Sequence, residues 1–232
     1  MFRKLNALLW LRLQVIISNS TLLATLLLPF GITILQNEFL NKNGELSMFL
    51  LSTSLTMVLS MGSGYMVSIM MAEDKEKRNL KSLLLSGVTA TEYTLSMMAL
   101  PLLVMLLSMV FLPLYLKVDL TNYLLAYSLY LILATISMIF LNIFIGAVSD
   151  TQSKAQVYSI FPMLTFSFLP TLAVQNETAQ KLLDYSFIGP LVSLLKEGGG
   201  ELSLRSLGLL LAWILLLGLA SLFVLKNSYK GK

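Results

Sequence analysis

Residues 71–93 read MAEDKEKRNLKSLLLSGVTATEY, and this stretch carries the densest charge in a chain that is otherwise mostly apolar. Seven charged side chains lie between Glu73 and Lys81. Apolar runs long enough to cross a bilayer lie on both sides of it, at residues 47–71 and 94–116. Charged groups are costly in hydrocarbon, so we predict that residues 73–92 form an aqueous segment between two membrane spans.

A short helix is predicted inside this segment. Its apolar residues recur at the spacing of one helical face: Leu80, Leu83, Leu84 and Val88. Acidic residues are expected at its leading end, where they suit the helix dipole: Glu73, Asp74 and Glu76. Gly87 is a natural stop. An apolar stripe with a charged shoulder suits lipid headgroups or a groove on another protein, and the alternative is a solvated loop that only joins two spans.

The composition is that of an integral membrane protein. Hydrophobic residues make up 56% of the chain, charged residues 12%, and the mean hydropathy is +0.81, whereas soluble domains carry about 25% charged residues. The absence of cysteine and histidine excludes disulfides, thiol catalysis, histidine acid–base chemistry and most zinc sites. The chain has no phosphate-loop motif of the form G-x-x-x-x-G-K-[ST], so we expect neither an enzyme nor a bound cofactor.

Six stretches reach or approach the roughly 20 apolar residues that a span needs. They are residues 15–35, 47–71, 94–116, 123–148, 156–174 and 202–225. Before them, residues 1–14 are predicted to form an interfacial helix with Trp10 at headgroup depth and with Arg12 snorkelling toward water. A signal peptide is the competing interpretation, but no typical cleavage site follows. We therefore predict an all-α, polytopic membrane protein with one domain over residues 1–232.

Basic residues predict the orientation. With six spans, eleven of the 16 Lys and Arg residues fall on the side that holds both termini and residues 73–92. The positive-inside rule places that side in the cytoplasm. The net charge of +4 then reflects the excess of basic residues on the cytoplasmic side of the membrane, and it does not indicate nucleic-acid binding.

The segment at residues 176–201, on the opposite side, contains an apolar run that is too short to cross. Gly189-Pro190 divides this run, and Asp184 and Lys196 bracket it. We predict a broken, re-entrant pair of short helices packed against protein, followed by a flexible joint at residues 198–200. The alternative is a loose loop with incidental leucines.

The spans show no clear buried charge in the sequence. Coupled secondary transporters usually carry ionisable groups near the midplane, so their absence argues against one here. Gly62-Ser63-Gly64, Asn142 and Gly146 are interpreted as helix-packing residues, because small residues let membrane helices approach closely.

Taken together, these features resemble the permease subunit of ABC-type exporters of the type 2 class. The motif runs from acids (Glu73 and Glu76) through a leucine-rich helix and a short turn to an acid that opens the third span (Glu92). In size and layout the chain is most similar to small permeases that export phenol-soluble modulins or confer bacteriocin immunity.

This resemblance implies roles for named residues. An ATPase-coupling helix would include Glu73, Glu76, Leu80, Lys81, Leu83, Leu84, Val88 and Glu92. An external gate would include Asp184, Tyr185, Phe187, Gly189, Pro190 and Lys196.

The resemblance also implies partners. ATP and Mg²⁺ would be bound by separate cytoplasmic ABC ATPase subunits, and a second permease copy or homologue would complete the pathway. The expected setting is the lipid of a bacterial cell membrane, with both termini cytoplasmic, and the expected cargo is an amphipathic peptide or another hydrophobic compound. The alternatives are a stand-alone secondary transporter or channel, and a non-transporting scaffold that recruits an ATPase.

Overall fold

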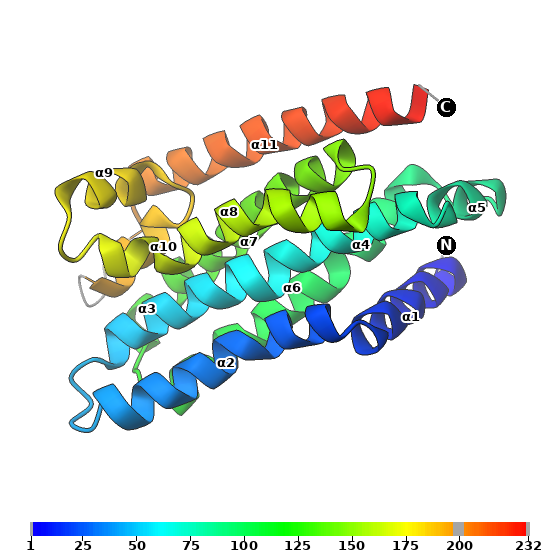
Figure 1. Ribbon diagram of the computed structural model, residues 1–232. Coiled ribbons are helices and arrows are strands. Elements are labelled where there is room, and N and C mark those ends of the chain that lie inside the picture. Colours follow the sequence, from blue (N-terminus) through cyan, green and yellow to red (C-terminus); the bar gives the residue numbers. More distant parts are fainter. Residues whose placement is uncertain (1, 197–201, 231–232) are drawn as a thin grey trace.

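The computed structural model describes residues 2–196 and 202–230. Every regular element in this part of the chain is a helix, which confirms the all-α prediction. Long helices lie side by side, and short helices lie at both ends of the bundle (Figure 1). Within the described residues, five stretches are long and apolar enough to cross a membrane: Ser20–Leu40, Ser47–Glu76, Thr91–Tyr115, Thr121–Val148 and Leu204–Lys226.

The first two helices are separated at Asn19. Helix α1 (Phe2–Ser18) extends four residues beyond the predicted interfacial helix, and α2 (Ser20–Leu40) begins five residues after the predicted start of the first span. Asn19 has an extended backbone, and its side chain accepts hydrogen bonds from the amides of Thr21 and Leu22. This N-cap satisfies amides that the first turn leaves free, so the helical chain restarts in a new direction.

The centre of the bundle is one continuous helical pass made of α3 (Ser47–Met57), η1 (Val58–Gly64) and α4 (Tyr65–Glu76). The seven residues of η1 form a π-helix, and all of them are buried. The pass continues to Glu76, whereas the predicted span ended at residue 71. The prediction that Glu73, Asp74 and Glu76 lead the loop helix is therefore wrong, because these acids form the last turn of α4.

Helix α8 (Gln152–Leu172) lies against α3, η1 and α4. Two serine pairs join them, Ser60 with Ser167 and Ser68 with Ser159, each with an Oγ–Oγ distance of 2.6 Å. The numbering of both pairs shows that α8 runs antiparallel to the central pass. Its 21 residues span roughly 30 Å, the thickness of a hydrocarbon core, although its mixed composition keeps it outside the five apolar stretches above.

The remaining helices complete the bundle. They are α5 (Asn79–Leu85), α6 (Ala90–Tyr115), the 3-10 turn η2 (Thr121–Tyr123), α7 (Leu124–Val148), α9 (Glu177–Tyr185), α10 (Gly189–Lys196) and α11 (Leu204–Lys230). The start of α1, helix α5 and the end of α11 lie at one end of the bundle, and α9 and α10 lie at the other (Figure 1). We call these the α5 end and the α9–α10 end. The predicted glycine joint at residues 198–200 lies outside the described residues.

Glycines allow the closest helix contacts. A Cβ atom at Gly64 would lie 2.8 Å from Asn142 Nδ2 and from two atoms of Met138 on α7. A Cβ atom at Gly146 would lie 2.9 Å from Met71 Cβ and 3.1 Å from the Ser68 carbonyl on α4. These distances support the packing interpretation of Gly64, Asn142 and Gly146.

Candidate functional site

The last turn of α4 carries a buried ion pair at the α5 end. Arg12 on α1 is fully buried, and its Nη1 lies 2.7 Å from Asp74 Oδ2. The Tyr93 hydroxyl on α6 donates to the same carboxylate oxygen at 3.0 Å, and the Arg12 Cζ atom lies 5.2 Å from the centroid of the Tyr93 ring. Three helices therefore meet at one carboxylate.

This cluster corrects two predictions. Arg12 does not snorkel, because α1 packs against α6 and encloses the guanidinium. The spans also contain a buried charge, Asp74, although it lies in the last turn of its helix and not at the middle. The Nη1–Oδ2 contact is short but poorly aligned for a hydrogen bond, and neither Nε nor Nη2 of Arg12 donates to any described residue. A buried charge with few hydrogen bonds depends heavily on its single partner.

Helix α5 has an inward and an outward side. Leu83 packs against the buried cluster that includes Leu8 and Tyr93, and Val88, three residues past the helix, is 9% exposed. Leu85 is 80% exposed and points away from the bundle. The Leu83 and Val88 part of the predicted stripe therefore packs the α5 segment against its own chain, whereas Leu85, which was not part of that stripe, is an exposed apolar side chain on this helix. The side chains of Leu80, Lys81 and Leu84 lie outside the described residues.

The segment around α5 is closed by defined turns. Gly87 follows the helix with a φ of +81°, and the Val88 amide donates to the Leu83 carbonyl at 3.1 Å, as in a Schellman C-cap. The Gly87 carbonyl accepts a hydrogen bond from Lys4 Nζ on α1 at 2.8 Å. Glu92 and Thr89 form a capping box at the start of α6: the Thr89 amide donates to Glu92 Oε2, and the Glu92 amide donates to Thr89 Oγ1. These contacts fix the C-terminal end of the α5 segment to α1 and to the start of α6.

Glu73 pairs locally within α4. Lys77 Nζ donates to Glu73 Oε1 at 2.6 Å, and this hydrogen bond, helped by the negative charge of the carboxylate, raises the pKa of Lys77 above its ordinary value. The lysine is largely exposed, so the pair adds little to stability. It orients Glu73 toward the turn that leads into α5.

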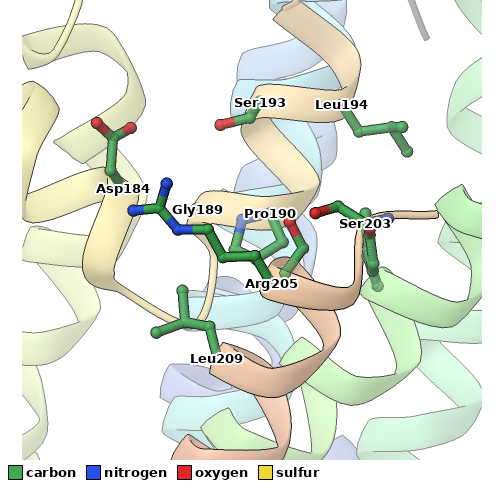
Figure 2. Close-up of a pocket in the computed structure, with 10 residues that line it drawn as sticks. Asp184, Gly189, Pro190, Ser193, Leu194, Ser203, Arg205 and Leu209 are labelled. Carbon is green, nitrogen blue, oxygen red and sulfur yellow. Dashed lines mark hydrogen bonds between the residues drawn. The ribbon is translucent and has the colours of Figure 1, made fainter. Parts of the chain in front are cut away.

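The predicted gate residues separate into two groups at the α9–α10 end. Asp184, Gly189 and Pro190 line a cavity of about 330 Å³, together with Arg205 and Tyr130, which sequence reasoning did not select. Figure 2 shows the Arg205 side chain, from the first turn of α11, directed toward Asp184 on α9. This cavity is the polar pocket of the α9–α10 end.

The other gate residues do not line this pocket. Phe187 is buried, with its ring centroid 4.5 Å from that of Phe166 and 5.9 Å from that of Trp213. Tyr185 is exposed, and its carbonyl accepts from Trp213 Nε1 at 2.8 Å. Lys196 is linked to Asp184 through Gln180, whose side chain accepts from Lys196 Nζ at 3.2 Å and donates to Asp184 Oδ1 at 2.7 Å.

The break between α9 and α10 lies at residues 186–188, so Gly189-Pro190 opens the second helix instead of dividing the two. Gly189 is required there because a Cβ atom would collide with the Leu183 carbonyl. Within the described residues, no group of three His, Cys, Asp or Glu side chains is placed to hold a metal ion.

Comparison with known proteins adds one match. A family model described as "ABC-2 family transporter protein" matches residues 5–223, which is nearly the whole chain. No curated protein and no solved structure matches it.

Proposed function

The chain belongs to the ABC-2 transporter family, and from this premise we propose that it is the permease subunit of an ATP-driven exporter that works with a separate ATPase. The family is one of multi-pass membrane permeases that act with ABC ATPases. In this proposal α8 is a sixth span, so that both ends of the chain lie on the cytoplasmic side with α5. A second copy or a homologue supplies the other half of the pathway.

The observation that carries the proposal is the seating of α5. The helix joins the central pass to α6 and contacts α4, and Leu83 packs against the buried cluster that also contains Leu8 of α1. Lys4 of α1 donates a hydrogen bond to the Gly87 carbonyl just beyond α5. A partner that binds at the exposed Leu85 and displaces α5 would therefore move α1, α4 and α6 with it. This is how a coupling helix transmits motion to the membrane spans.

The proposed cargo is an amphipathic peptide or a similar hydrophobic compound that enters from the membrane. Its support is the resemblance in size and layout, together with 13 Met and 12 Phe residues in 232. Unbranched Met side chains adapt to varied apolar surfaces. The polar pocket of the α9–α10 end would lie on the exit side.

The decisive experiment compares Leu85→Asp with Ser82→Asp, an exposed polar position on the same helix. We expect Leu85→Asp to weaken ATPase co-purification by about tenfold or more, a loss of about 1.4 kcal/mol, because a charge replaces the apolar contact. Ser82→Asp should retain the partner. Leu83→Asp is a poorer test, because Leu83 holds α5 on the bundle and its loss would disturb the seat itself.

The same preparation in lipid vesicles tests transport, with an amphipathic helical peptide and a scrambled peptide of equal composition as cargo. The proposal expects ATP-dependent uptake of the amphipathic peptide only. A chain that elutes alone and still moves solute would indicate a stand-alone transporter or channel. A chain that recruits the ATPase but moves neither peptide nor another hydrophobic compound would indicate a scaffold.

A further inference from the structure

Two adjacent residues of α4 bind the junction between α7 and α8. Lys75 Nζ donates to the carbonyls of Ala147 at 2.6 Å and Ser149 at 2.7 Å, with the Gly146 carbonyl at 3.4 Å. Helix α7 ends at Val148, so these are carbonyls at its C-terminal end, some of which no helical amide satisfies. A positive ammonium group suits that end of the helix dipole.

Glu76 serves the other side of the same junction. Its Oε2 accepts a hydrogen bond from the amide of Gln152 at 2.7 Å, and Gln152 is the first residue of α8. A negative carboxylate suits an N-terminal helix end. Thr151 caps α8 in addition, since its side chain accepts from the Lys154 amide at 3.3 Å. Lys75 therefore binds the C-terminal end of α7, and Glu76 binds the N-terminal end of α8.

Tight packing beneath the junction leaves it little freedom. Gly146 lies so close to α4 that a Cβ atom would meet Met71 and the Ser68 carbonyl. Ala72 on α4 and Ala155 on α8 are both fully buried, and Ser68 pairs with Ser159 one turn further along. Helix α4 continues through a two-residue turn into α5. The end of α4 is therefore connected both to α5, through this turn, and to the α7–α8 junction, through Lys75 and Glu76. Figure 1 shows both at the same end of the bundle.

We propose that Lys75 and Glu76 are positioning residues that make the α7–α8 junction move as one body with α4 and α5. The inference rests on the proposed function and extends it: a displacement of α5 reaches α7 and α8 through these two side chains as well as reaching α1 and α6. Neither residue needs to touch an ATPase. Lys75 supplies the stronger part of the joint, because it binds two carbonyls at short distance.

The joint is testable in the permease alone, because the chain has no cysteine. Spin labels at Ser82→Cys on α5 and Asp150→Cys in the junction report the distance between the two bodies. Both positions are exposed, and the pair that Asp150 makes with Lys154 is exposed as well, so its loss on labelling costs little stability. We expect one narrow distance distribution in the parent and in Lys75→Arg, and loss of that single narrow peak in Lys75→Met.

Coupling provides the second readout. With the ATPase bound, Lys75→Met should keep ATP hydrolysis and lose cargo moved per ATP, and Lys75→Arg should restore it. If Lys75→Met does not fold, Glu76→Ala replaces it, with Glu76→Gln as the control that retains an acceptor for the Gln152 amide. An unchanged distance distribution and an unchanged transport-to-hydrolysis ratio would overturn the inference. If the parent recruits no ATPase, the proposed function fails while the distance measurement still tests the joint.

Discussion

At the scale of single residues, Arg12 shows that the tertiary environment determines whether a charged side chain is solvated or buried. In the sequence it interrupts an apolar helical face, where a long cationic side chain would normally reach water. In the structure it meets Asp74 and the ring of Tyr93, both brought from other helices. The resulting pair joins α1 to the helix end that leads into α5.

A double-mutant cycle tests this pair. Arg12→Met or Asp74→Asn alone should lower stability by about 3–5 kcal/mol, because each leaves a buried charge without its partner. The double variant should lose much less than the sum of the two. Thermal unfolding followed by the fluorescence of the two tryptophans measures all four proteins. Additive losses would show that the two charges do not depend on each other.

At the scale of elements, the π-helix η1 is held where α2, α6, α7 and α8 all contact it. Its glycines are not equivalent, because Gly64 faces Asn142 and Met138 at close range whereas Gly62 has ordinary van der Waals space. The polar groups of this region are used within the protein, as the Ser60–Ser167 pair shows. Small residues here set the spacing between helices.

Alanine substitutions separate the two glycines. Gly64→Ala should destabilise the protein by about 1–3 kcal/mol, because the new methyl group forces Asn142 and Met138 to shift. Gly62→Ala is the matched control and should leave stability unchanged or slightly raised, because helical alanine is favoured over glycine. The midpoint of thermal unfolding in detergent reports the difference. Equal midpoints for the two variants would contradict the packing role of Gly64.

At the scale of the whole molecule, the number of crossings depends on α8. Lys154 lies in the first turn of α8, and Thr178 lies beyond its other end, at the start of α9. The two residues are at opposite ends of the bundle, and both are exposed. With six spans, an impermeant thiol reagent applied to intact cells should label Thr178→Cys and not Lys154→Cys. Asn43→Cys, in the exposed α2–α3 connection, serves as the positive control. Labelling of Thr178→Cys and Lys154→Cys from the same side would mean that α8 does not cross.

Local sequence patterns were enough to predict an all-helical membrane protein and the position of its long apolar spans. They also predicted a short helix between the second and third spans, with Gly87 as its stop. The reason is that hydrocarbon forces each span to satisfy its own backbone, so length, apolarity and turn residues act locally. The prediction of short helices within residues 176–201 rests on the same local signals, although the break lies at residues 186–188.

Tertiary structure alone decided which side of α5 faces the bundle, where Arg12 finds its counter-charge, and what Lys75 and Glu76 bind. The local pattern of Leu83 and Val88 is the same for a helix that seats on its own chain and for one that enters a partner's groove. Arg12 and Asp74 are 62 residues apart, and Lys75 lies 72 residues from Ala147. Such contacts depend on how distant helices pack together, and no repeat or spacing within one helix encodes them.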